Sequence, residues 1–302
     1  MGIVGARGHT GAELLRLIRD HPSLDLAFAG SRELAGQPVP GRDDVLFESI
    51  GPEELSTRDI DAVLLALPDG AGDPYVSALG EDTIIVDISA DHRFDDAWEY
   101  GLPELFREKL KGATRIANPG CYATTTQIAL APLLDVVSGV PAVFGVSGYS
   151  GAGSTPGPRN DPERLRDNLM PYKLVGHNHE REATQHLGVP VRFIPHVHPA
   201  FRGLLVTAHV PLGAEMDGDA VRARFVRQYD DEPLIEIRDE IPELKDGAGY
   251  PGVIVGGFEV STDGLNAVVV AAEDNLLKGA AVQAIQNLNL ALGLPEFEGL
   301  VD

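Results

Sequence analysis

The chain has 302 residues, of which 43% are hydrophobic and 23% are charged. This composition is typical of a globular protein and excludes a disordered one, and at about 150 residues per domain the length predicts two domains. The formal net charge of −22 opposes binding to nucleic acid and to anionic membranes. An anionic small-molecule substrate therefore needs a local cationic pocket.

The chain has a single cysteine, which excludes an intramolecular disulfide and a cysteine-based metal site. Its apolar runs, such as Ala62–Leu67, have the length of strands and not of membrane-spanning helices. Charged side chains interrupt the first 20 residues, so no signal-peptide core is present there. We expect a cytoplasmic protein.

The first 120 residues alternate between short apolar runs and amphipathic stretches, which predicts a parallel sheet covered by helices. The expected strands are Ile3–Val4, Leu24–Ala29, Ala62–Leu67, Ile84–Ile88 and Arg115–Ala117. The first of them is short against a usual length of about five residues. We therefore expect a few native residues to precede the sequence.

The rest of the chain predicts a second, mixed or antiparallel sheet. Its expected strands are Pro141–Val146, Val191–Ile194, Leu204–Val210, Leu234–Ile237, Val253–Val260 and Leu265–Ala271. The last two flank Ser261–Gly264, a hairpin signal, and Leu276–Leu292 has helical periodicity. The prediction is an α/β protein of two domains. Residues 1–119 and 274–302 are expected to form the domain with the parallel sheet, and residues 120–273 an α+β domain with the mixed or antiparallel sheet.

A glycine-rich loop follows the first strand, with the sequence Gly5-Ala6-Arg7-Gly8-His9-Thr10-Gly11. Glycines allow a sharp turn and close approach of a ligand, and the following helix directs amide groups at the loop. Thr10 and Glu13 have capping-box spacing, which predicts that the helix starts at Thr10. We expect this loop to bind the phosphates of a dinucleotide through Gly5, Arg7, Gly8, His9, Thr10 and Gly11.

The second strand ends in Gly30-Ser31-Arg32, where an NAD-binding protein usually has an acidic residue. A hydroxyl and a guanidinium suit a 2′-phosphate, so Ser31 and Arg32 favour NADP(H) over NAD. The alternative is that Arg32 is an ordinary surface arginine.

The cysteine lies in Asn118-Pro119-Gly120-Cys121-Tyr122-Ala123-Thr124, immediately before a predicted helix. The positive end of a helix dipole stabilises a thiolate, so Cys121 is a candidate nucleophile. The alternative is an inert buried cysteine.

This cysteine block resembles the active-cysteine signature of N-acetyl-γ-glutamyl-phosphate reductases, which belong to the aspartate-semialdehyde dehydrogenase group. The resemblance extends along most of the chain, through the blocks Gly8–Arg16, Ser31–Gly36, Asp87–Phe94, Tyr100–Leu105, Gly145–Gly153 and Asp274–Ala281.

The resemblance implies a Rossmann-type dinucleotide-binding domain at residues 1–119 and 274–302, and a catalytic, substrate-binding and dimerisation domain at residues 120–273. It implies an NADPH-dependent reduction of an acyl phosphate through a thioacyl intermediate on Cys121. It implies His177 as proton donor with His179 as second choice, and Glu182 as the residue that orients the imidazole. It also implies a substrate site with Arg93, Asn118 and Arg202, further cofactor contacts from Ser89, Gly151 and Asn275, and a homo-oligomer, either a dimer or a tetramer. Arg93, Lys173, Arg181 and Arg202 are the candidate cations for the anionic substrate.

Three departures from the family pattern lie in the predicted substrate domain. Thr125 replaces a small residue, Asn178 and Arg181 replace Arg and Pro, and the segment Pro195–Pro199 differs from the usual form. They leave the exact acyl phosphate open, with aminoadipyl or aspartyl phosphate as alternatives to N-acetyl-glutamyl phosphate.

Two other functions compete with this reading. The pairs His177/His179 and His196/His198 have spacing that on a strand suits a metal, although a helix start at His177 would make its pair diverge. We expect no metal site. A non-catalytic NADP-sensing module would keep the glycine loop but would have no use for Cys121 at a helix start.

Overall fold

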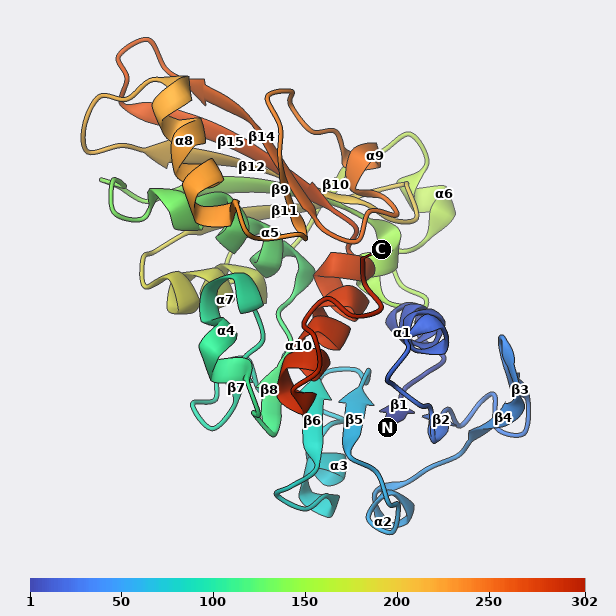
Figure 1. The fold of residues 1–302 in the computed structure, drawn as a ribbon. Coiled ribbons are helices and arrows are strands. Elements are labelled where there is room, and N and C mark those ends of the chain that lie inside the picture. Colours follow the sequence, from blue (N-terminus) through green and yellow to red (C-terminus); the bar gives the residue numbers. More distant parts are fainter. Residues whose placement is uncertain (302) are drawn as a thin grey trace. The chain divides into compact units, whose positions relative to one another are not determined.

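The computed structural model describes residues 1–301, which form two compact units (Figure 1). The first unit contains Met1–Gly120 and the segment from Ala280 onward, and the second contains Cys121–Gly279. Within residues 1–301, no helix combines the length and the apolar character needed to cross a membrane. The domain division drawn from the sequence, at 119/120 and 273/274, stays a prediction.

The first unit is an eight-stranded sheet in the order β3-β4-β2-β1-β5-β6-β8-β7, parallel except for the β3–β4 pair. Its strands are β1 (Gly2–Val4), β2 (Phe28–Gly30), β3 (Pro38–Val39), β4 (Arg42–Glu48), β5 (Ala62–Leu65), β6 (Ile84–Asp87), β7 (Glu99–Tyr100) and β8 (Arg115–Ala117). Its helices are α1 (His9–Asp20), α2 (Pro52–Leu55), α3 (Asp73–Ala78), α4 (Pro103–Leu110) and α10 (Val282–Leu292).

Every residue of β1, β5 and β6 is buried, as expected for parallel strands covered on both faces. The C-terminal helix α10 returns to this unit and packs against α1, α4 and β6 (Figure 1). Of the predicted strand Leu24–Ala29, only Phe28 and Ala29 belong to a strand, because β2 pairs with β1 over its three residues and with β4 only at Ala29 and Gly30. The short strands β3, β4 and β7 were not predicted.

The second unit is a mixed seven-stranded sheet in the order β10-β11-β9-β12-β15-β14-β13. Its strands are β9 (Ala142–Gly148), β10 (Met170–Pro171), β11 (Arg192–His198), β12 (Leu204–Pro211), β13 (Ile235–Ile237), β14 (Val253–Val260) and β15 (Asn266–Glu273). Its helices are α5 (Cys121–Leu130), α6 (Pro162–Leu165), α7 (Asn178–Leu187), α8 (Gly218–Tyr229) and α9 (Leu244–Gly247), with 3₁₀ turns at Ala131–Leu133 and Tyr149–Ala152.

The predicted mixed sheet and the hairpin between β14 and β15 are confirmed. The predicted helix Leu276–Leu292 is interrupted: a π-helical turn, Leu277–Ala281, precedes α10. The amide of Gly279 donates to the carbonyl of Asp274, five residues earlier, which widens the turn.

Helix α5 is the buried centre of the second unit and packs against β12, β15 and α7. All its residues after Cys121 are buried. The hydroxyl of Tyr122 donates to the carbonyl of His196 at 2.7 Å and ties the start of α5 to β11. A side chain at Gly145 would lie 2.6 Å from the Tyr122 ring, so this glycine makes room for that ring.

Candidate active site

Each of the three glycines in the N-terminal loop has a different structural role. Gly5 has φ +90°, and a Cβ there would lie 2.2 Å from the carbonyl oxygen of Ala66. A Cβ on Gly11 would lie 2.6 Å from the backbone of Ala6, whereas one on Gly8 would meet only the Gly5 oxygen, at 3.8 Å. A tight turn, open space for a ligand and close helix–strand packing are the roles of glycines in a dinucleotide-binding loop.

Helix α1 begins at His9 with Gly8 as its N-cap, so the predicted start at Thr10 is wrong. The Ala12 amide donates to the Gly8 carbonyl at 2.9 Å and closes the first turn before Thr10 could cap it. The amides of the first turn of a helix point out of its N-terminus, which here is directed at the glycine loop. They supply the donors that a pyrophosphate needs at a helix N-terminus.

The end of β2 carries the residues expected to select the cofactor. Ser31 is buried, and its Oγ accepts from the Leu34 amide at 3.2 Å, while the Arg32 side chain is exposed. Glu33, the residue after Arg32, pairs with Arg7 at 2.5 Å, so its negative charge is compensated by Arg7. This arrangement leaves the positive charge of Arg32 available and suits a 2′-phosphate.

The glycine loop and Ser31–Arg32 follow β1 and β2, and Ser89 and Asn118 follow β6 and β8. These strands are parallel, so all four segments leave the sheet at its carboxyl edge. The chain turns from β2 on one side of β1 to β5 on the other, and such switch points bind ligands. The residues present therefore fit a dinucleotide.

Three other predicted site residues of this unit are held by internal hydrogen bonds. Ser89 donates to the buried carboxylate of Asp87 at 2.7 Å. Arg93 is buried and donates from Nε to the Asn118 carbonyl at 2.8 Å and from Nη2 to that of Ile88 at 2.9 Å. Asn118 is fully buried, and its Oδ1 accepts from Asn287 at 3.0 Å. These contacts order the strand ends, and the predicted ligand contacts stay predictions.

Cys121 is the first residue of α5 and is half-buried, as the position of the cysteine block predicts. A Cβ on Gly279 would lie 2.6 Å from the Cβ of Cys121 and 2.7 Å from Oε1 of the buried Glu273. Thr125, one of the residues that depart from the family pattern, donates a hydrogen bond from Oγ1 to the Cys121 carbonyl at 3.1 Å. Its buried hydroxyl is therefore satisfied. Cys121 thus lies at the positive end of a helix dipole on tightly packed backbone.

His177, His179 and Tyr172 form an aromatic cluster with Tyr122 and Phe193. The His177 ring centroid lies 4.8 Å from that of His179, 5.5 Å from that of Tyr172 and 5.4 Å from that of Phe193. The expectation that the two imidazoles diverge is wrong. His177 is the N-cap of α7 and has extended backbone, so its side chain turns back over the first helical turn.

His177 is neutral near pH 7. Burial, with the nearby charges of Lys173 and Arg159, lowers its pKa to about 4. Its Nδ1 accepts from the His179 amide at 3.2 Å, which leaves the proton on Nε2. The expected imidazolium donor is therefore replaced by a neutral imidazole that offers an Nε2–H group.

The remaining predicted residues of the second unit differ in their surroundings. Glu182 is fully buried on α7, and Gly151 is exposed in a 3₁₀ turn. Arg202 pairs with the fully buried Asp274 at 3.3 Å. Asn275 accepts from the Gly203 amide and donates to Ser150, so both ends of its amide hold local structure. The predicted roles of these four residues stay predictions.

Tyr172 and Arg159 were missed by the sequence analysis. Burial raises the pKa of Tyr172 above its usual range, with a smaller contribution from the charge of Cys121, so the phenol stays protonated. The guanidinium of Arg159 lies 4.9 Å from the centroid of the Tyr172 ring. Both residues lie in or beside loops without a motif, and only the tertiary contacts identify them.

His196 and His198 share β11, and the His196 ring packs at 4.3 Å on Phe144. In the described part of the chain, no three His, Cys, Asp or Glu residues are grouped so that they could hold a metal ion.

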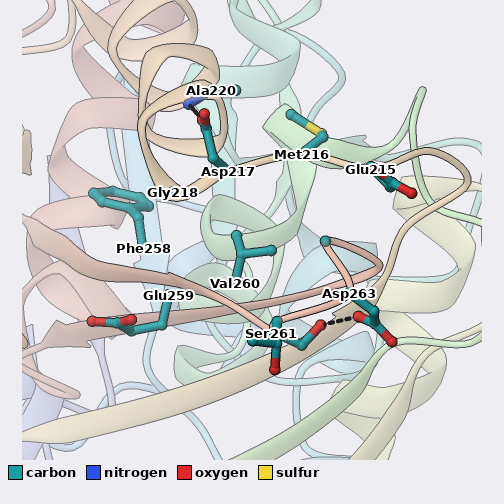
Figure 2. A pocket seen from close by; sticks show the side chains of 12 residues that line it. Glu215, Met216, Asp217, Gly218, Ala220, Phe258, Glu259, Val260, Ser261 and Asp263 are labelled. Atoms are coloured by element: carbon teal, nitrogen blue, oxygen red, sulfur yellow. Dashed lines mark hydrogen bonds between the residues drawn. The ribbon is translucent and has the colours of Figure 1, made fainter.

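A cavity of about 740 Å³ lies in the second unit between the β14–β15 hairpin and the start of α8 (Figure 2). Its lining includes Glu215, Asp217, Glu259 and Asp263 and no basic residue. Asp217 caps α8, and Asp263 accepts from Ser261 at 2.6 Å, as Figure 2 shows. An acidic cavity repels an anionic ligand, so this cavity does not suit the anionic substrate that the sequence predicts.

Two family models match the chain. The model described as semialdehyde dehydrogenase, NAD binding domain, matches residues 1–113, and the semialdehyde dehydrogenase dimerisation domain matches residues 121–275. The chain is 52% identical to the N-acetyl-gamma-glutamyl-phosphate reductase of Xanthomonas campestris pv. campestris, over 99% of this chain and 98% of that protein. It is 49% identical to the reductase of the same name from Xylella fastidiosa, over 99% and 92%.

Solved structures agree on the fold. Aspartate semialdehyde dehydrogenase II from Vibrio cholerae matches with a TM-score of 0.80 at 20% identity, over 97% of each chain. The crystal structure of aspartate semialdehyde dehydrogenase with NADP from Candida albicans matches with a TM-score of 0.74 at 16% identity, over 97% of this chain and 98% of that one. These similarities support the two-unit α/β architecture predicted from the sequence.

Proposed function

Since the chain belongs to the N-acetyl-gamma-glutamyl-phosphate reductase family of semialdehyde dehydrogenases, we propose that it reduces N-acetyl-γ-glutamyl phosphate with NADPH. The products are N-acetyl-glutamate 5-semialdehyde and phosphate, a step of arginine biosynthesis. The observation that carries the proposal is Cys121 at the start of α5, in the same unit as the His177 cluster.

Cys121 begins the reaction. Its thiolate attacks the γ-carbonyl carbon, the bond between the acyl group and the phosphate oxygen breaks, and phosphate leaves. The dipole of α5 favours this thiolate, since Cys121 occupies the first position of a ten-residue helix. The acyl chain is then held as a thioester on Cys121.

His177 stabilises the oxygen of the reacting carbonyl. During each addition this oxygen becomes negative, and the neutral imidazole donates a hydrogen bond from Nε2 without losing its own proton. The Nδ1 contact to the His179 amide orients the ring for this role. Collapse of the thiohemiacetal releases the semialdehyde and restores the Cys121 thiolate.

NADPH, when bound, supplies the hydride that reduces the thioester. The amides at the start of α1 would hold its pyrophosphate, and Ser31 and Arg32 its 2′-phosphate. The match to a dimerisation domain supports a homo-oligomer, and we propose that the enzyme works in the cytoplasm. The net charge of −22 disfavours a substrate carried on an acidic protein and favours the free acetylated amino acid.

The reverse reaction tests this proposal. Purified protein, NADP⁺ and phosphate are combined with N-acetyl-glutamate semialdehyde, aspartate semialdehyde and the corresponding aminoadipate semialdehyde, and NADPH formation is followed by absorbance. We expect the highest kcat/KM with the acetylated glutamate derivative. Preference for another semialdehyde would overturn the substrate assignment.

The variant Cys121→Ser serves as the control for the mechanism. A serine hydroxyl is barely ionised at neutral pH, so we expect NADP binding to persist and turnover to disappear. Turnover that survives this change would contradict the covalent mechanism.

A further inference from the structure

Arg159 is a cation beside the His177 cluster that the reaction described above does not use. Its guanidinium carbon lies 4.9 Å from the centroid of Tyr172, and the Tyr172 ring lies 5.5 Å from that of His177. The positive charge is close enough to contribute to the lowered pKa of His177. Arg159 is itself exposed, and its guanidinium reaches the cluster from a surface loop.

The charge of Arg159 is not neutralised within the protein. In the part of the chain that the structure describes, no carboxylate forms an ion pair with it, although the chain carries 46 acidic residues. Arg202 differs, since it already pairs with the buried Asp274 at 3.3 Å. Lys173 also faces a neutral group, the Oδ1 of Asn178, at 3.0 Å. Two uncompensated cations thus flank His177, and the ring of Tyr172 orients the guanidinium.

We infer that Arg159, oriented by Tyr172 and assisted by Lys173, binds the α-carboxylate of the acylated amino-acid substrate and determines specificity for it. This inference rests on the function proposed above. The carboxylate stays with the acyl chain while Cys121 carries it, whereas the phosphate leaves. A cation in the same unit as Cys121 can hold the chain through both steps, and a guanidinium matches a carboxylate with two parallel hydrogen bonds.

The test compares two aldehydes in the reverse reaction, N-acetyl-glutamate semialdehyde and 4-acetamidobutanal, which lacks only the carboxylate. In Arg159→Met we expect KM for the first to rise about tenfold or more, since a hydrogen-bonded charge pair is lost. KM for 4-acetamidobutanal and for phosphate should stay unchanged in this variant. The preference for the aldehyde that carries a carboxylate should therefore be smaller in the variant than in the wild type. Arg159→Lys should recover part of it.

Arg166→Met is the matched control, since Arg166 is an exposed arginine that pairs with Glu163 at 2.6 Å. Its kinetics should equal those of the wild type. An unchanged preference in Arg159→Met, or a rise confined to the KM for phosphate, would overturn the inference while leaving the proposed function standing. If the wild type does not turn over N-acetyl-glutamate semialdehyde, the proposed function and the inference both fall.

Discussion

The Nδ1 atom of His177 accepts a hydrogen bond from the backbone amide of His179 at 3.2 Å. This contact caps α7, places the remaining ring proton on Nε2 and brings the two imidazoles to 4.8 Å. A histidine expected to act as a charged acid is thereby held as a neutral donor with a fixed orientation.

The lowered pKa of His177 predicts a pH-dependent stability. Between the ordinary pKa of 6.5 and the folded value of about 4, the unfolded chain binds a proton at this site and the folded chain does not. The free energy of unfolding should therefore fall as the pH is lowered from 6.5 to 4. Urea denaturation at several pH values should show a smaller decline in His177→Asn, which lacks this group. Equal slopes would mean that His177 titrates normally.

The same variant separates catalysis from helix capping. Asparagine is a good N-cap, so His177→Asn should keep α7 intact while it removes the Nε2 donor. We expect kcat to fall about 10²–10³-fold, the usual effect of losing one donor to an oxyanion, with NADP affinity unchanged. His179→Asn should cost less and act mainly on KM. The opposite ranking of the two variants would assign the donor role to His179.

Gly279 should be essential to the geometry of Cys121. In Gly279→Ala the new Cβ would stand 2.6 Å from the Cβ of Cys121 and 2.7 Å from the Glu273 carboxylate, so the backbone must shift. A displacement of about 1 Å can cost about 10²-fold in rate. We expect slower turnover and slower iodoacetamide labelling. Gly80→Ala, where a Cβ would meet nothing within 4 Å, is the control, and normal labelling of Gly279→Ala would show that the site adapts.

Arg32 should determine the choice between NADP and NAD. In Arg32→Asp the carboxylate repels a 2′-phosphate and can accept from a 2′-hydroxyl, so we expect KM for NADP to rise about tenfold or more and KM for NAD to fall. Arg16→Asp makes the same charge change on α1, where Arg16 pairs with Glu13, and measures the general charge effect. An unaltered KM for NADP would place Arg32 away from the adenosine ribose.

Patterns between neighbouring residues predicted much of the fold. The strand Val253–Val260 and the hairpin after it agree with the sequence pattern because alternation and turn residues act between neighbours in the chain. The start of α1 was placed wrongly, since Thr10 has capping-box spacing but the Gly8 carbonyl closes the first turn earlier. The short strands β3, β7 and β10 have too few residues to show any periodicity.

The sequence by itself determined that a glycine loop lies between a strand and a helix and that Cys121 begins α5, since both features depend on adjacent residues. Only the tertiary structure decided that His177 is neutral, that Arg159 and Tyr172 lie beside it, and that Gly279 lies against Cys121. The physical reason is that a pKa and a close packing contact depend on burial and on charges brought from distant parts of the chain, and no local pattern encodes these.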